Sequence, residues 1–61
     1  MAFKDRLKQA REAKGYTQGQ LAKLLGVTKS AVSNYESGSN HVKEQILYKI
    51  FDVLEVDPNY L

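Results

Sequence analysis

Cysteine and tryptophan are absent from the 61 residues of this chain, and histidine and proline occur once each. Without cysteine, the chain can form neither a disulfide framework nor a thiolate zinc site, and His41 alone cannot hold a metal ion. We therefore expect no metal and no other cofactor. The reducing cytoplasm is the expected compartment.

Long apolar runs are also missing, because charged residues interrupt them. No segment is therefore expected to span a membrane, and the basic start at residues 1–4 leads into amphipathic sequence rather than a signal peptide. The chain also lacks paired carboxylates in an apolar setting, so the sequence does not favour an enzyme. A chain this short allows one domain, residues 1–61, whose modest core leaves it marginally stable.

The net charge is only +2, but the charges are unevenly distributed. Residues 1–14 carry five basic and two acidic side chains, whereas residues 39–61 carry two basic and four acidic ones. The basic half would favour the approach of a polyanion such as nucleic acid. A solvated charged helix would show the same pattern, so charge alone leaves both interpretations open.

Apolar residues recur at helical spacing along most of the chain. They predict helices at about residues 3–14, 18–25, 28–36 and 43–54, and the first turn of a fifth helix at residues 59–61. Local signals support these ends: Thr17 with Gln20 forms a capping box, Thr28 can cap the third helix, and Asp57-Pro58 is typical of a helix start. The polar residues 37–40 predict a loop.

Residues 18–37 have the layout of two short helices joined by a tight turn. Helices that cross steeply come very close together, and the small Ala22 occupies the expected crossing point. Gly26 tolerates the positive φ that the turn requires. Apolar side chains then fill the angle between the helices: Leu21, Leu25, Val32 and Tyr35. This layout is that of a helix-turn-helix, whose second helix enters the major groove of DNA.

Several short motifs carry a family resemblance that covers nearly the whole chain. They are Thr17-Gln18, Leu21-Ala22, Gly26-Val27-Thr28, Ala31-Val32-Ser33, Tyr35-Glu36 and Gly38, followed by Lys49-Ile50 and Leu54-Glu55-Val56. Together they resemble the Cro and lambda-type repressor (XRE) family of bacterial and phage transcription regulators. The resemblance implies an all-α, compact, four- to five-helix lambda-repressor-like DNA-binding domain, with the helix-turn-helix formed by its second and third helices.

The resemblance also implies a structural ion pair between Arg11 and Glu36. Related phage repressors carry an arginine and a glutamate at the matching positions, where the pair clamps the first helix to the end of the third. The alternative is that the two residues are unrelated surface charges.

Candidate base-reading residues follow from the faces of the third helix. Ala31, Val32 and Tyr35 are expected in the core, which leaves Lys29, Ser30, Ser33 and Asn34 on the outward face. Lysine can donate to guanine, asparagine can bond adenine with two hydrogen bonds, and serine can bond either base. We assign base reading to Lys29, Ser30 and Asn34, and the positions that match them in the family read bases.

Contacts to the DNA backbone are expected from a second set of residues: Gln18, Thr28, Ser33, Ser37 and Asn40. Gln18 begins a helix, where exposed amides and the helix dipole favour an anion, and the family uses this glutamine for the DNA backbone. Thr28 could instead simply cap its helix, and Ser33 could make no contact. Lys8, Lys14 and Lys43 are plausible basic contacts without a defined place.

Three departures from the family pattern bear on these expectations. Phe51 stands where relatives usually have alanine, so it must either enlarge the core or lie on a surface. Gly19 occupies the first turn of the second helix, where glycine lowers helix stability by about 1 kcal/mol relative to alanine in a helix interior. His41-Val42 replaces a stretch that is often basic and proline-containing, which weakens the case for backbone contacts from that loop.

These observations predict sequence-specific binding of a pseudo-palindromic double-stranded DNA operator by a bacterial or phage regulator. We expect a weak homodimer that DNA strengthens, with Tyr60 and Leu61 as the main members of its contact, although these residues could instead close the small core. Three alternatives stay open: a helix-turn-helix protein-interaction module, an antitoxin-type regulator, and the DNA-binding part of a longer repressor.

Overall fold

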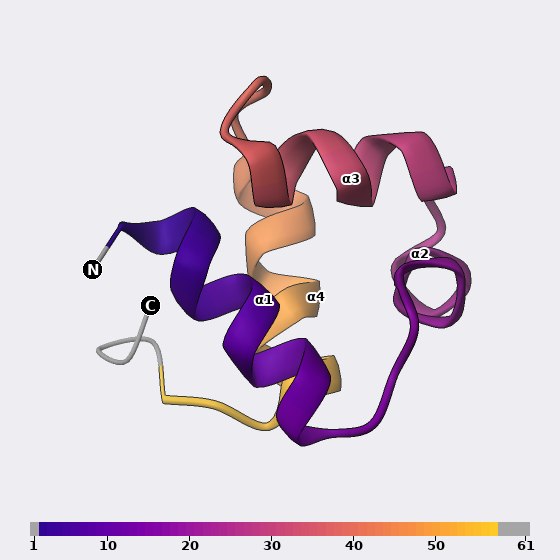
Figure 1. Cartoon of the computed structure of the whole chain (residues 1–61). Coiled ribbons are helices and arrows are strands. Elements are labelled where there is room, and N and C mark those ends of the chain that lie inside the picture. Colours follow the sequence, from indigo (N-terminus) through magenta and orange to yellow (C-terminus); the bar gives the residue numbers. More distant parts are fainter. Residues whose placement is uncertain (1, 58–61) are drawn as a thin grey trace.

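The computed structural model describes residues 2–57 of the chain. Within them the protein consists of four helices and no strand: α1 (Phe3–Ala13), α2 (Gln18–Leu25), α3 (Lys29–Ser37) and α4 (Glu44–Leu54). In Figure 1, α3 lies across the top of the molecule, α1 runs diagonally in front of α4, and α2 is seen end-on beside them. The all-α fold class and the four predicted helices are confirmed. The predicted fifth helix lies outside the described residues.

Threonine and glycine residues set the start and end of α2 and the start of α3. The Thr17 hydroxyl accepts a hydrogen bond from the Gln20 amide (3.1 Å), and the Gln20 side chain accepts one from the Thr17 amide (2.8 Å), which completes the predicted capping box. Gly26 ends α2 in the left-handed conformation, at φ 75°. Thr28 then caps α3 by accepting from the Ala31 amide at 3.1 Å. These local signals fix where the two helices of the motif begin and end.

Some helix ends differ slightly from their predictions. Ser37 was expected in a loop, but it is the last residue of α3, because the chain leaves the helix only at Gly38, whose φ is 82°. The first residue of α4 is Glu44, with Lys43 as its N-cap. Both differences are of one residue.

The core gathers buried side chains from all four helices: Leu7, Ala10, Leu21, Ala22, Leu25, Val32, Ile50 and Leu54. Helix α2 packs against α3 and α4, and α1 packs against α3. Ala22 is buried, as expected for a residue at a close helix crossing. Phe51 is half-buried, while Tyr48 and Leu24 expose 60% and 51% of their surface. None of the described helices has the length and apolar character that crossing a membrane requires.

Candidate nucleic-acid interface

Helix α3 presents a polar face away from the core. Lys29, Ser30 and Ser33 are exposed, and Asn34 is half-buried at the edge of this face. Within residues 2–57, these four side chains make no hydrogen bond and no ion pair. Val32, on the opposite side of the helix, is fully buried. Four unpaired polar groups on one helix face are available to a ligand outside the protein.

The backbone carbonyl of Asn34 organises the end of α3. It accepts hydrogen bonds from the Gly38 amide, from the Ser39 amide (3.0 Å) and from the Ser37 hydroxyl (3.1 Å). The same hydroxyl lies 2.8 Å from the Ser39 hydroxyl. The Ser37 hydroxyl hydrogen is therefore used inside the turn, which leaves Ser37 a poorer donor to DNA than the sequence indicated. The exposed Asn40 side chain carries no such bond.

The starts of α3 and α2 each combine a capped amide with hydrogen-bond donors that remain free. The Thr28 oxygen accepts the Ala31 amide, so its hydroxyl hydrogen is left for a further partner. At the start of α2, the capping box satisfies the Gln20 amide, while the amides of Gln18 and Gly19 have no partner within their own helix. A Cβ on Gly19 would meet only the Thr17 hydroxyl oxygen, at 3.9 Å. The fold itself therefore does not require glycine at this position.

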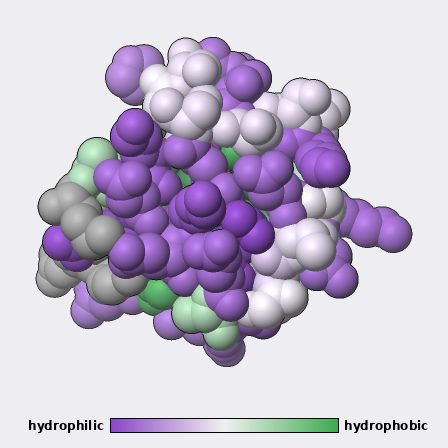
Figure 2. Space-filling view, viewed as in Figure 1, coloured by the Kyte–Doolittle hydropathy of each residue, from purple (hydrophilic) through white to green (hydrophobic). Residues whose placement is uncertain are grey.

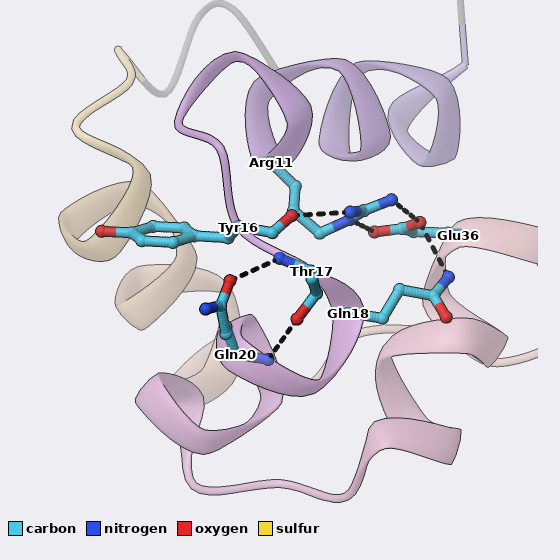
Figure 3. A network of polar contacts seen from close by, with 6 residues as sticks. All are labelled: Arg11, Tyr16, Thr17, Gln18, Gln20 and Glu36. Carbon is cyan, nitrogen blue, oxygen red and sulfur yellow. Dashed lines mark hydrogen bonds and ion pairs between the residues drawn. The ribbon is translucent and has the colours of Figure 1, made fainter.

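Arg11 and Glu36 form a nearly buried ion pair that joins α1 to the end of α3 (Figure 3). The Arg11 Nε and Nη2 atoms donate to the two Glu36 oxygens at 2.7 and 3.1 Å, and Nη1 donates to the Tyr16 carbonyl at 2.8 Å. The side chains of Arg11 and Glu36 are 10% and 4% exposed. The hydrogen bond to Glu36 raises the pKa of the Arg11 guanidinium, so the group stays charged. This is the pair that the family resemblance implied.

Gln18 also bonds to Glu36, which the sequence did not indicate. Its side-chain Nε2 donates to Glu36 Oε1 at 3.1 Å. One of its two amide hydrogens is thus used inside the protein, and the other is free. Figure 3 shows the Gln18 nitrogen turned toward Glu36 and the oxygen turned away from it.

Lys4 lies beside the end of α3, although sequence reasoning gave it no role. A Cβ on Gly38 would lie 3.1 Å from Lys4 Cδ and 3.9 Å from its Nζ, so the ammonium group sits next to the loop after α3. A shallow cleft of about 400 Å³ lies here, and Lys4, Asn40 and His41 are among the residues that line it. The helical spacing of Lys4, Lys8 and Arg11 was the signal that could have placed Lys4 on the side of α1 that faces α3.

The surface over α1 is largely hydrophilic (Figure 2). Lys14 pairs with Glu55, an exposed contact between the residues that cap the C-terminal ends of α1 and α4. No group of three or more histidine and acidic side chains within residues 2–57 is placed to hold a metal ion.

A protein-family model described as "Helix-turn-helix" matches residues 7–61 of the chain. Among curated proteins, an SPbeta prophage-derived uncharacterized HTH-type transcriptional regulator of Bacillus subtilis is 36% identical over 59 residues, which are 97% of this chain and 55% of that protein. An uncharacterized HTH-type transcriptional regulator of Sinorhizobium fredii is 42% identical over 55 residues, 90% of this chain and 38% of that protein. The chain thus spans about half or less of the length of these relatives.

Three solved structures share the fold. The restriction-modification controller protein C.AhdI from Aeromonas hydrophila superposes with a TM-score of 0.88 at 34% identity, over 95% of this chain and 88% of that one. SinR, a master regulator for biofilm formation solved in complex with DNA, gives 0.86 at 36% identity, over 95% and 97% of the two chains. The P22 c2 repressor, solved with a synthetic operator, gives 0.92 at 23% identity over 98% and 91%, a likeness of fold alone.

Proposed function

Since the chain belongs to the helix-turn-helix family, we propose that it binds a specific double-stranded DNA sequence as a transcription regulator of the Cro and lambda-repressor type. The observation that carries the proposal is the outward face of α3, where four polar side chains have no partner within the described residues. A helix of this width fits the major groove of B-DNA, which displays a distinct donor and acceptor pattern for each base pair.

Base reading is assigned to three residues of α3. The Lys29 ammonium donates to guanine O6 and N7, the Asn34 amide forms two hydrogen bonds with adenine, and Ser30 donates to or accepts from a neighbouring base. Asn34 lies in the second half of α3 (Lys29–Ser37), so it reads a base pair closer to the end of the helix than Lys29 and Ser30 do.

Backbone contacts surround this reading face. The free amides at the start of α2 and the second N–H of Gln18 donate to one phosphate, and the Thr28 hydroxyl donates to another. Ser33 and Asn40 supply neutral hydrogen bonds at the edge of the contact. Lys4 adds a positive charge beside the loop after α3, where Ser37 is already engaged.

Operator binding takes two copies of the chain. The longest principal axis of the molecule measures 25 Å, whereas successive major grooves on one side of DNA are roughly 34 Å apart. One copy therefore reads one half-site, and a pseudo-palindromic operator brings two copies together. Tyr48 is exposed and Phe51 is half-buried on α4, where both are available for a weak two-fold contact. Tyr60 and Leu61, the main members expected from the sequence, lie outside the described residues.

The relatives support a proposal for the setting of this activity. The chain matches parts of longer HTH-type regulators, so we propose that this domain acts in the cytoplasm of a bacterium or phage host, alone or as the DNA-binding part of a longer regulator. No cofactor enters the proposed mechanism.

Selection of bound sites from random DNA, followed by affinity measurements over a range of salt concentrations, tests the proposal. We expect a pseudo-palindromic consensus, cooperative binding of two copies, and an affinity that falls steeply with salt as phosphate contacts are lost. If no sequence is enriched and binding to DNA is not detected, the proposal is wrong. A protein partner whose binding hardly depends on salt would then favour a protein-interaction module.

A further inference from the structure

Glu36 accepts hydrogen bonds from two other helical regions of the protein. Arg11 of α1 supplies two of its donors, and the side chain of Gln18, the first residue of α2, supplies the third. With only 4% of its side chain exposed, Glu36 is almost closed to solvent. Gln18, which is proposed to bind a DNA phosphate, is therefore in direct contact with Glu36 of the ion pair.

Resting on the proposed function, we infer that Glu36 is a positioning residue for DNA binding. Glu36 holds the side-chain amide of Gln18 in one orientation. The second N–H of that amide and the free backbone amides of Gln18 and Gly19 then form a preorganised binding site for one DNA phosphate. The ion pair with Arg11 thereby acts on DNA affinity as well as on stability.

The chemistry of the three groups fixes the orientation of the Gln18 amide. An ionised carboxylate only accepts hydrogen bonds, so the nitrogen of Gln18 must face Glu36, and the reversed amide would bring its oxygen against the carboxylate. A phosphate also only accepts hydrogen bonds. The remaining N–H of Gln18 is thus the one donor that its side chain has left to offer to a phosphate.

Preorganisation has a definite source here. A glutamine free in solvent would lose its rotamer freedom on binding DNA, and the bond to Glu36 removes much of that freedom beforehand. Arg11 Nη1 also holds the Tyr16 carbonyl at 2.8 Å, two residues before Gln18. The same network therefore fixes the turn that leads into α2, and with it the direction of the first amides of the helix.

The experiment compares affinities for the selected operator and for copies in which single phosphates are replaced by neutral methylphosphonates. The variants are Gln18→Ala, Gln18→Asn and Glu36→Gln. Asp52→Asn on α4 is the control, because Asp52 is exposed and the substitution changes the net charge equally without touching the network. Circular dichroism establishes that each variant is folded at the assay temperature.

We expect Gln18→Ala to weaken binding roughly tenfold, since a hydrogen bond to a charged group is lost. Gln18→Asn should behave in the same way, because the shorter side chain cannot reach Glu36 and the phosphate together. One methylphosphonate should weaken the parent by a larger factor than it weakens these variants, which keep only the backbone amides at that phosphate. Glu36→Gln should show the same reduced sensitivity at that phosphate, whereas Asp52→Asn should retain the sensitivity of the parent.

The outcomes separate the two proposals. If the parent itself binds no operator, the proposed function fails. If the parent binds and Gln18→Ala is weaker, but Glu36→Gln and Gln18→Asn keep the parent's sensitivity at that phosphate, Glu36 has only a structural role and the inference is overturned. Should Glu36→Gln fail to fold, Gln18→Asn decides alone, because it leaves the ion pair intact, and parent-like affinity then overturns the inference.

Discussion

The two sides of helix α3 differ in whether their side chains have partners within the protein. On the inner side, Val32 is fully buried and Glu36 accepts three hydrogen bonds from Arg11 and Gln18. On the outer side, Lys29, Ser30 and Ser33 are exposed and have no partner within the described residues. A helix of nine residues thus has inner side chains that pack or bond within the protein and outer side chains that are left for a partner. Substitutions on each side should have effects of different kinds.

The largest effect is expected on the inner side. Glu36→Gln and Arg11→Met should each lower the free energy of unfolding by roughly 3–5 kcal/mol, because each leaves a charge almost closed to solvent without its partner. The double variant should lose less than the sum of the two. Urea unfolding of the four proteins measures this, with Asp52→Asn as the exposed control. Strict additivity would show that the two charges do not interact in solution.

The next effect belongs to the outer side. Asn34→Ala and Lys29→Ala should each lose about 1–3 kcal/mol of discrimination at one base position in each half-site. Their free energy of unfolding should change by no more than about 0.5 kcal/mol, because neither side chain has a partner within residues 2–57. Affinities for single-base variants of the operator measure the first quantity, and urea unfolding measures the second. A large loss of stability in either variant would contradict the division between the two sides.

Thr28 stands where the two sides meet, as the N-cap of α3. Thr28→Ala should lower the free energy of unfolding by about 1 kcal/mol, since the Ala31 amide loses its acceptor. Thr28→Ser keeps the hydroxyl and is the matched control, so it should retain both the stability and the contact to the DNA backbone. Thermal unfolding compares the three proteins. Equal midpoints for the alanine and serine variants would rule out a contribution from the cap.

The smallest effect is expected from the exposed pair Lys14 and Glu55, since the Glu55 side chain is 72% exposed. Hydrogen bonding to Lys14 lowers the pKa of the Glu55 carboxyl. Its contribution to stability is therefore present above the ordinary carboxyl pKa of about 4.5 and is lost as the pH falls through the lowered value in the folded protein.

Unfolding measured between pH 2 and pH 7 should show this small loss in the parent and not in Glu55→Gln. Asp52→Asn, in the last turn of α4, is the control for removing a carboxylate. If Glu55→Gln lowered the free energy of unfolding at neutral pH as much as Glu36→Gln does, burial would not be what distinguishes the two ion pairs.

Helix ends could be predicted from the sequence because their signals are local. The capping box at Thr17 and Gln20 and the glycine stop at Gly26 each depend on residues within one turn of the chain, and the structure contains both. Ser37 was misplaced by one residue, because the end of α3 is set by the left-handed Gly38 rather than by the first polar residue.

Contacts between helices were harder to predict. Arg11 and Glu36 are 25 residues apart, so spacing could not pair them, and the prediction came from the family resemblance alone. The bond from Gln18 to Glu36 and the position of Lys4 beside Gly38 depend on the angles at which three helices dock. Binary patterns along the chain do not specify those angles. The roles of the outward residues of α3 in DNA binding stay predictions.

The separation of Arg11 from Glu36 along the chain also leads to an expected order of assembly. Helices α2 and α3 are joined by residues 26–28 alone, whereas docking α1 closes a loop of 25 residues and costs more chain entropy. We therefore expect the motif to assemble from local contacts and α1 to dock afterwards, with opening in the reverse order. Native-state hydrogen exchange should find the α1 amides in a unit that opens more easily than α2 and α3. In that open form, we expect the helix-turn-helix to persist while Glu36 has lost its bond to Arg11. The lifetime of the form that binds DNA would then depend on α1, a helix that carries none of the proposed base-reading residues.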